Sequence, residues 1–488
     1  MLNWGLAVLS AALLILTFPR FHITWFAAVA LTPLLVAAAK ETRPWRRFLL
    51  GWVAGTMFWF GVCYWIQYTL AFYGGVGQAL GWALLLLFAV AKGLHLGVFA
   101  LLAGILMRRW WAVPAVAALW VTVESTHGSL GFAWLVLGNA GIDMGVPLRL
   151  APITGVWGLS FVFAMLSAAV ALLILRRQRL QNLWLLLLPC LVFLPEAPRP
   201  ERGNVSAILV QPNIDDETEW TPELLRQTEQ QLTLLSLSPA AGRQGSTELI
   251  VWPEAPAPFY DTDHEFLGVM ASVARQTHAA VLSGIVAHAA DGSPLNSALM
   301  MSPNGAVVSR YDKVNLVPFG EFVPWPFGLV TRKVSTEAGD FAAGNKVVVT
   351  SVDSHRTGTF ICYESVFPSY IRRFAADGAE ALFNISNDSW FGKSQARYQH
   401  LQIVRMRAAE NSRWILRATD NGITAAIDPA GRVVRTAEEY AELSARFSFR
   451  YRRNLTFYTR FGDWFVLLCA LIAAAAIMSA VLPARHRP

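Results

Sequence analysis

The hydrophobic positions divide the chain into two kinds of region, and the pattern of the first kind is typical of a membrane domain. A helix that crosses a bilayer needs about 20 mostly apolar residues. Eight runs approach that length, and they lie at 4–19, 21–39, 48–72, 78–106, 110–124, 150–175, 181–195 and 463–482. The first run could instead be a cleaved signal peptide, but no basic residue precedes it and a second run follows at once. We therefore predict eight transmembrane helices.

The second kind of region lies between the seventh and eighth runs, and its pattern is typical of a soluble α/β domain. Short β-type runs occur at 205–210, 249–252, 280–286, 297–301, 306–311, 358–362, 381–385 and 423–427. Helical patterns occur between some of them, at 222–237, 265–277, 366–376 and 395–413. Strands interleaved with helices predict a mixed sheet covered by helices.

Composition and charge agree with this division. Only 15% of the 488 residues are charged and the mean hydropathy is +0.41, whereas soluble domains average about 25% charged residues. Residues 1–195 hold 12 of the 40 Lys and Arg but 3 of the 33 Asp and Glu, a net charge of +9; the other residues carry −2. The basic excess therefore belongs to the apolar region, which argues against a nucleic-acid-binding protein.

The cations in the short loops predict the orientation of the helices, because Lys and Arg accumulate on the cytoplasmic side. Alternate loops hold 11 cations, namely Lys40, Arg43, Arg46, Arg47, Arg108, Arg109, Arg176, Arg177, Arg179, Arg485 and Arg487. The opposite loops hold only Arg20 and Arg149. Both termini are thus expected in the cytoplasm and the soluble domain in the periplasm, in a multi-pass protein of the cytoplasmic (inner) membrane.

These patterns give four expected regions. Residues 1–195 form a membrane domain of seven transmembrane helices, and the proline-rich segment 196–203 forms a linker. Residues 204–455 form the periplasmic domain, and 456–488 form the last transmembrane helix and a cytoplasmic tail.

One cysteine stands apart from the other three. Cys63, Cys190 and Cys469 fall in predicted spans, where a small apolar role is the ordinary one. Cys362 is the single cysteine of the predicted outer domain, so it is either a buried inert thiol or a reactive one.

The surroundings of Cys362 suggest chemistry. It ends a strand-like run and precedes a helical pattern, a turn that lifts a nucleophile out of the sheet. A thiol is mostly protonated at neutral pH and needs a base or a cation beside it. Glu254 and Lys313 also follow strand-like runs. Each alone could be a solvated loop charge, but the set of three favours a catalytic site.

The segments around these residues resemble a known superfamily. Trp-Pro-Glu254, the Lys313 segment and Ile-Cys362-Tyr-Glu resemble the Glu–Lys–Cys triad of the nitrilase (carbon–nitrogen hydrolase) superfamily. The surrounding apolar runs, Val-Pro-Phe-Gly-Glu-Phe-Val-Pro at 317–324 and Asn-Asp-Ser-Trp-Phe at 387–391, resemble its membrane-embedded branch, the apolipoprotein N-acyltransferases. Asn315 departs from the histidine common there, which puts a local hydrogen bond in doubt but not the triad.

The resemblance implies an αββα sandwich beside the membrane domain and a ping-pong acyl transfer. Glu254 would be the general base, Cys362 the nucleophile that forms a thioester, and Lys313 with a backbone N–H near Tyr363 the oxyanion support. The donor would be the sn-1 chain of a phospholipid such as phosphatidylethanolamine, and the acceptor the N-terminal amine of a diacylglyceryl-cysteine apolipoprotein. No metal or other cofactor is implied.

Further residues have expected supporting roles, each beside a plainer alternative. Glu321 and Glu364 would orient Lys313 or the nucleophile loop, or be ordinary loop and helix-start carboxylates. Val317–Val330 reads as an apolar arm dipping toward the membrane, with Trp390 and Phe391 as a lid-like loop, although both segments could simply cover the core. Trp220 and Trp134 are candidates for the substrate entrance, and Trp134 could equally anchor the membrane interface.

Two rival functions remain open on the sequence. A membrane-tethered amidase would use the same triad on water and would need only one anchor. A non-catalytic receptor or transporter with a periplasmic binding domain would not bring Glu254, Lys313 and Cys362 together. The role of Lys92 and His95, three residues apart in the fourth predicted span, is not decided by the sequence.

Overall fold

The structure, a computed structural model, describes residues 1–129, 132–177, 179–214, 219–240, 247–323 and 341–481. The chain separates into two compact units. The first comprises Met1–Phe72, Val76–Ala197 and Phe461–Pro488, and the second comprises Pro198–Arg460 together with Tyr73–Gly75.

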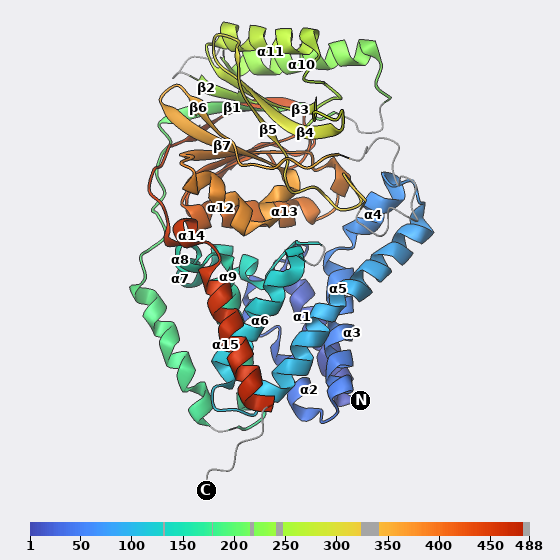
Figure 1. Cartoon of the computed structure of the whole chain (residues 1–488), viewed down its shortest axis with the longest axis vertical. Coiled ribbons are helices and arrows are strands. Elements are labelled where there is room, and N and C mark those ends of the chain that lie inside the picture. The colour runs from blue at the N-terminus through green and yellow to red at the C-terminus, as the bar shows by residue number, and fades with distance from the viewer. Residues whose placement is uncertain (130–131, 178, 215–218, 241–246, 324–340, 482–488) are drawn as a thin grey trace. The chain divides into compact units, whose positions relative to one another are not determined.

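The first unit is helical (Figure 1). Its elements are α1 (Leu2–Thr17), η1 (Thr24–Ala28), α2 (Thr32–Lys40), α3 (Pro44–Val62), α4 (Trp65–Phe72), α5 (Gln78–Leu106), α6 (Ala112–Ser129), η2 (Leu137–Asp143), α7 (Gly145–Leu148), α8 (Ala151–Thr154), α9 (Val156–Ile174), η3 (Arg179–Phe193) and α15 (Trp464–Val481). Within the described residues, α5, α9 and α15 are long and apolar enough to cross a membrane, and α3 with α4 would make a fourth span bent by 61°.

The predicted runs and the observed helices therefore differ in continuity. The run at 48–72 is bent between α3 and α4, and the run at 21–39 is divided between η1 and α2, where Pro33 lies in the first turn of α2. Proline is tolerated at the start of a helix but not in its interior, so a new helix begins there. The structure thus supports three to four spans by length and composition, and the count of eight stays a prediction.

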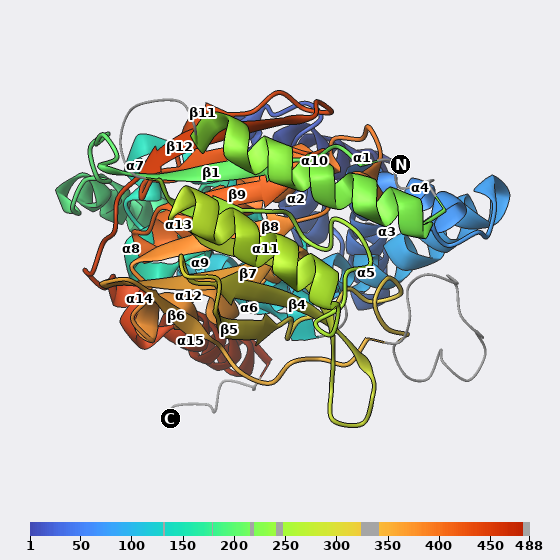
Figure 2. The same cartoon turned by 90° about the horizontal axis from the view of Figure 1, so that it is seen from above.

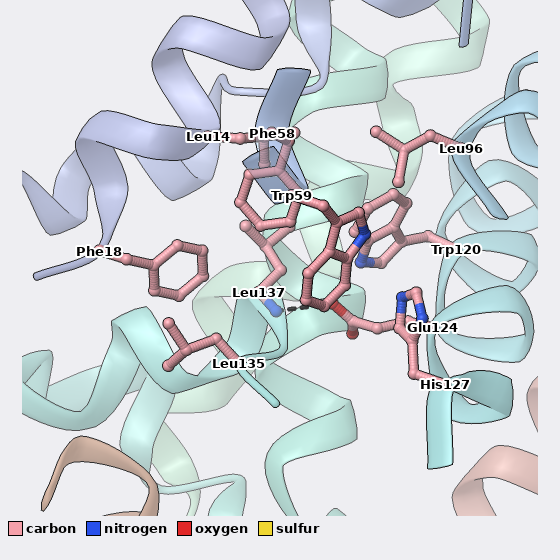
Figure 3. A pocket seen from close by; sticks show the side chains of 10 residues that line it. All are labelled: Leu14, Phe18, Phe58, Trp59, Leu96, Trp120, Glu124, His127, Leu135 and Leu137. Carbon is pink, nitrogen blue, oxygen red and sulfur yellow. Dashed lines mark hydrogen bonds between the residues drawn. The ribbon is translucent and has the colours of Figure 1, made fainter. Parts of the chain in front are cut away.

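A small pocket lies in the core of the helical unit, and it contains an acidic side chain (Figure 3). Leu14, Phe18, Phe58, Trp59, Leu96, Trp120, Glu124, His127, Leu135 and Leu137 line it. Glu124 is buried on α6, and its Oε1 accepts a hydrogen bond of 2.6 Å from the backbone N–H of Leu137. The carboxylate therefore ties α6 to the start of η2.

Replacing Glu124 by alanine is expected to destabilise the helical unit. The buried N–H of Leu137 would lose the acceptor 2.6 Å away, and a buried unsatisfied donor costs about 1–3 kcal/mol. Glu124→Gln keeps an acceptor oxygen and should cost less. Thermal unfolding of the full chain in detergent measures the difference, and equal midpoints for Glu124→Ala and the unmodified chain would contradict it.

The second unit is a four-layered α/β sandwich (Figure 1). One six-stranded sheet has the order β12-β1-β2-β3-β4-β5, and the other has the order β11-β10-β9-β8-β7-β6. The strands are β1 (Val205–Gln211), β2 (Thr247–Val251), β3 (Ala280–His288), β4 (Pro294–Met301), β5 (Val307–Asp312), β6 (Val349–Val352), β7 (His355–Ile361), β8 (Ala381–Ser386), β9 (Ile415–Thr419), β10 (Ala425–Ile427), β11 (Val433–Thr436) and β12 (Leu443–Phe449).

Helices cover the outer face of each sheet. The helices α10 (Pro222–Ala240) and α11 (His264–Thr277) pack side by side on the first sheet, as Figure 2 shows from above. The helices α12 (Pro368–Ala376) and α13 (Ala396–Asn411) pack on the second sheet. Two 3-10 turns, η5 (Cys362–Val366) and η6 (Ser389–Phe391), follow strands of the second sheet, and α14 (Phe457–Phe461) lies near the end of the unit.

Parallel pairing brings several strand ends to the same edges. In the first sheet β2 pairs in parallel with β1 and β3. In the second sheet β8 pairs in parallel with β7 and β9, with Ile361 opposite Ile385. The segments that leave the carboxyl ends of parallel strands therefore emerge together, which is where open α/β sheets usually place their sites.

Candidate active site

Glu254 lies three residues beyond the end of β2 and is buried. The loop that carries it lies directly against β3, because Gly284 has no side chain there. A Cβ at Gly284 would lie 2.3 Å from the Ala255 nitrogen and 2.7 Å from the Glu254 Cα. The Gly284 N–H also donates to the Pro253 carbonyl at 3.1 Å. The glycine thus permits the close approach that places the carboxylate.

Lys313 follows β5 and sits between two carboxylates. Its Nζ lies 3.1 Å from Glu254 Oε1 and 2.8 Å from Glu321 Oε1, and its side chain is 1% exposed. Asn296 on β4 donates from Nδ2 to the same two oxygens, at 2.8 and 2.7 Å. Four side chains from distant segments therefore form one buried charge cluster.

The charges around Lys313 decide its protonation state. Burial alone lowers the pKa of a lysine. The carboxylates of Glu254 and Glu321 act in the opposite direction and outweigh burial, so the pKa of Lys313 lies above its ordinary value. Lys313 is thus a fixed cation that bridges two carboxylates.

Cys362 begins η5, one residue after β7 ends at Ile361, where the sequence had placed it in the strand itself. Its φ is +47°, in the left-handed region that a non-glycine residue rarely adopts. Strained residues of this kind cluster at functional sites, where their surroundings hold them. Cys362 therefore sits at a sharp strand-to-turn corner.

The charges of Glu254 and Lys313 act on the pKa of the Cys362 thiol. Burial raises its pKa, and the Glu254 carboxylate raises it further, while Lys313 lowers it. The net effect is a pKa above the ordinary value, so the resting thiol is protonated at neutral pH. A base beside the sulfur is then needed to make it a nucleophile.

Glu364 connects the loop of Lys313 with the corner of Cys362. Its Oε1 accepts from Tyr311 Oη at 2.6 Å and from the Val314 N–H at 2.8 Å. Its Oε2 accepts from the Ile361 N–H at 2.8 Å. Burial raises the pKa of Glu364, and these hydrogen bonds oppose that shift. Asn315, the residue that departs from the family pattern, also donates its backbone N–H to Glu364 Oε1, at 3.2 Å.

Glu321 is aimed into the cluster by a tight turn. Its Oε2 accepts from the Val317 N–H at 2.8 Å, and its own N–H donates to the Val317 carbonyl at 2.9 Å. Phe319, at the tip of the turn, has a φ of +63° and is exposed. The predicted arm reaches further, but residues 324–330 lie outside the described residues.

The remaining predicted residues take different positions. Tyr363 follows Cys362 in η5 and is buried. Trp390 is half-buried and Phe391 buried in η6, where the Phe391 ring packs edge-on against His400. Trp220 is exposed just before α10. Trp134 belongs to the helical unit and is buried against Trp65, with ring centroids 5.0 Å apart.

Several residues that the sequence did not single out contribute to the site. Asn296 binds both carboxylates, and the Asn387 N–H donates to Glu254 Oε2 at 2.8 Å. Asp388, His400 and Arg417 form a buried network beside Cys362. Their signal in the sequence is weak: Asp388 belongs to the Asn-Asp-Ser-Trp-Phe motif, but His400 lies inside the helical pattern at 395–413, and Arg417 interrupts the apolar residues that follow it. Among the described residues, no three His, Cys, Asp or Glu side chains are grouped as metal ligands.

Comparison with known proteins matches both halves of the chain. Residues 209–449 match the carbon-nitrogen hydrolase family, and residues 10–169 match the apolipoprotein N-acyltransferase N-terminal domain. The apolipoprotein N-acyltransferase of Geobacter metallireducens is 33% identical over 98% of this chain and 95% of its own length. The chain belongs to the apolipoprotein N-acyltransferase family. This confirms the family predicted from the sequence motifs.

Other members of the apolipoprotein N-acyltransferase family match at similar levels. The Pseudomonas putida enzyme is 30% identical over 97% of this chain and 96% of its own length. The Pseudomonas aeruginosa enzyme is 32% identical over 99% of this chain and 93% of its own length. Among solved structures, Saccharomyces cerevisiae Nit3, a member of the nitrilase superfamily, is similar to 50% of this chain over 90% of its own length, with 17% identity and a TM-score of 0.39. The match of residues 209–449 to the carbon-nitrogen hydrolase family and the full-length relatives identify the chain as an N-acyltransferase of the nitrilase superfamily.

Proposed function

We propose that this enzyme moves the sn-1 acyl chain of a phospholipid to the N-terminal amine of a diacylglyceryl-cysteine apolipoprotein, through a thioester on Cys362. One observation carries the proposal. Glu364 joins the segment of the buried Glu254–Lys313–Glu321 cluster to the Cys362 corner, because it accepts from the N–H groups of Val314 and Ile361, in a chain that matches the acyltransferase family over nearly its whole length.

The first half-reaction begins at the protonated thiol. Glu254 takes the proton from Cys362 as the sulfur attacks the sn-1 ester carbonyl. The tetrahedral intermediate then collapses, the ester C–O bond breaks, and Glu254 returns the proton to the leaving oxygen of the lysophospholipid. Both Glu254 oxygens accept hydrogen bonds, from Asn296 and Lys313 on Oε1 and from the Asn387 N–H on Oε2, and these contacts hold the carboxylate in place.

Lys313 stabilises the oxyanion that forms in each half-reaction. Two carboxylates keep this ammonium charged and fixed, and a preorganised cation in a site closed to water stabilises developing negative charge strongly. The backbone N–H of Tyr363 supplies the second donor in this proposal, with Glu321 and Glu364 orienting Lys313 and the corner of Cys362.

The second half-reaction uses the same groups in the reverse sense. The α-amino nitrogen of the lipoprotein attacks the thioester carbonyl, and the C–S bond breaks to leave an amide and the Cys362 sulfur. Glu254 takes the amine proton and passes it to the sulfur. This alternation is a ping-pong mechanism, and no metal or other cofactor takes part in it.

The membrane arrangement is part of the proposal. Eight apolar runs and the bias of 11 loop cations against two support eight spans with both termini in the cytoplasm and the catalytic domain in the periplasm of the inner membrane. We propose the regions 1–195, 196–203, 204–455 and 456–488 as membrane domain, linker, catalytic domain and last span with its tail. Trp220, Trp134, Trp390 and Phe391 are proposed to flank the lipid entrance.

A product analysis with the full chain tests the function. Nanodiscs would contain phosphatidylethanolamine with an isotope-labelled sn-1 chain and a synthetic diacylglyceryl-cysteinyl peptide. Mass spectrometry is expected to find the label as an amide on the peptide, with one lysophospholipid for each amide. The same peptide with an acetylated N-terminus should gain no label.

Two outcomes would overturn the proposal. Label recovered as free fatty acid, with the peptide unmodified, would show a hydrolase. The absence of both products and of any acyl group on the enzyme would favour a non-catalytic membrane protein.

A further inference from the structure

A buried hydrogen-bond network lies behind the nucleophile, and His400 on α13 is at its centre. His400 Nε2 lies 3.1 Å from the carbonyl oxygen of Cys362 and 2.9 Å from Ser365 Oγ. Its Nδ1 lies 3.1 Å from Asp388 Oδ1. The side chains of His400, Asp388 and Arg417 are all 0% exposed. The proposed mechanism uses none of these three side chains directly.

The Asp388 side chain is held in place by hydrogen bonds within this network. Arg417 Nη2 donates to both of its oxygens, at 2.7 and 2.6 Å, and Ser386 Oγ donates to Oδ1 at 3.0 Å. A Cβ on Gly422 would come within 2.5 Å of Asp388 Oδ2, so only glycine permits this packing. Burial raises the pKa of Asp388, but the Arg417 guanidinium beside it lowers it, and the pKa lies below its ordinary value, so the carboxylate is ionised.

The same loop also holds the proposed general base. Asn387, next to Asp388 in the chain, donates its N–H to Glu254 Oε2 at 2.8 Å. Asp388 in turn contacts His400, which contacts the Cys362 carbonyl. The loop that follows β8 therefore contacts the proposed base directly, through Asn387. Through Asp388 and His400 it is also connected to the corner that carries the proposed nucleophile.

The proton on the His400 ring decides which contacts are hydrogen bonds. Burial and the neighbouring Arg417 charge lower the pKa of His400, so the ring is neutral at neutral pH. A neutral ring has one donor and one acceptor nitrogen. Arg417 Nη2 lies 3.2 Å from Nδ1 and can only donate, whereas the Cys362 carbonyl can only accept. With the proton on Nε2, the Cys362 carbonyl accepts it and Nδ1 accepts from Arg417. Asp388 Oδ1, 3.1 Å from Nδ1, then takes its hydrogen bonds from Arg417 Nη2 and Ser386 Oγ rather than from His400.

Holding the Cys362 carbonyl also fixes the next N–H group. The peptide unit is planar and trans, so the N–H of Tyr363 points opposite to the carbonyl of Cys362. Glu364 already holds the Ile361 N–H on the other side of the corner, at 2.8 Å. We infer that His400 is a positioning residue, which holds the Cys362 carbonyl and so aims the Tyr363 N–H at the acyl carbonyl. The inference rests on the proposed thioester mechanism.

Three substitutions at His400 test this role in the full-length enzyme in nanodiscs. His400→Leu removes both polar contacts. His400→Gln can carry an amide N–H near the Nε2 position, and His400→Asn places its amide near the Nδ1 position instead. The kcat for thioester formation from phosphatidylethanolamine is expected to fall about 10²-fold in the Leu and Asn variants, the loss typical of a misplaced reacting group. The kcat of the Gln variant should be at least about tenfold higher than that of the Leu and Asn variants. The KM should be unchanged in all three variants.

A matched control uses another histidine of the same domain. His355 begins β7, the strand that ends just before Cys362, and its Nδ1 pairs with Glu380 at 2.7 Å. Six residues of extended strand, at about 3.3 Å each, separate it from the corner. His355→Gln should therefore keep the kcat of the unmodified enzyme.

The outcomes separate this inference from the proposed function. An unmodified enzyme that forms no thioester would remove the proposed function itself. A thioester in the unmodified enzyme, with equal kcat in the Gln and Asn variants or a change in KM alone, would overturn the role of His400. If His400→Leu does not fold, the ratio of the Gln and Asn rates decides, because both retain a polar side chain.

Discussion

Replacing Cys362 by alanine is expected to abolish acylation of the enzyme by phospholipid. No other side chain of the charge cluster can form a thioester, and loss of the nucleophile in an enzyme of this type lowers kcat on the order of 10⁶-fold. Intact-protein mass spectrometry after incubation with phosphatidylethanolamine measures the adduct. The unmodified chain should gain one acyl group that neutral hydroxylamine removes, and Cys362→Ala should gain none.

The serine variant makes this prediction sharper. Cys362→Ser can form only an oxygen ester, which neutral hydroxylamine leaves in place. It should form slowly, because Glu254 must then take a proton from a much weaker acid. A hydroxylamine-sensitive adduct on Cys362→Ala would contradict the assignment of the nucleophile.

The other cysteines provide the matched control. Cys63 and Cys469 are buried in the helical unit, and Cys190 is exposed there. A chain with Cys63, Cys190 and Cys469 all changed to alanine retains Cys362 alone and should form the same adduct in the same amount. Loss of the adduct in that triple variant would place the acyl group elsewhere.

Replacing Lys313 by methionine is expected to lower both the rate and the stability. The rate of thioester formation should fall by about 10²–10³-fold, the cost of losing one oxyanion donor. Stability should fall by about 3–5 kcal/mol, because Glu254 and Glu321 would face each other as buried carboxylates without their cation. The midpoint of thermal unfolding and the single-turnover rate measure the two effects separately.

A double variant distinguishes the two roles of Lys313. Lys313→Met with Glu321→Gln removes one cation and one anion, so the buried charge left without a counter-ion is smaller. The double variant should regain part of the lost unfolding midpoint while the rate stays low, because the oxyanion donor is still missing. Recovery of the rate together with the midpoint would show that Lys313 acts only through stability.

Local sequence was enough to find Cys362 and the charged residues of the cluster, but it did not show how they are paired. Glu254, Lys313 and Cys362 each follow an apolar strand-like run, and the structure places them after β2, β5 and β7. The bridge of Lys313 between Glu254 and Glu321 joins positions 59 and 8 residues apart. Such a pairing depends on strand order, which short-range patterns do not specify.

Four strands have no apolar run long enough to predict them, for a related reason. β6 and β11 have only four residues each, and polar residues interrupt the longer β9 and β12, including Arg417 in β9 and Arg446 in β12. Arg417 is buried because Asp388 and Asn384 accept its hydrogen bonds. A buried arginine weakens the apolar run by which a strand is recognised, although its partners make it stable in the core.

Composition, run length and motifs are enough to predict that this protein belongs in a membrane, that an α/β domain precedes its last apolar run, and which family it resembles. The chain carries these properties locally. That Asn296, Asn387 and Glu364 hold the cluster, and that His400 lies against the Cys362 carbonyl, could be seen only in the folded chain. These contacts join residues far apart in the sequence: Asn387 meets Glu254 across 133 residues, and only the stacking of two sheets brings such positions together.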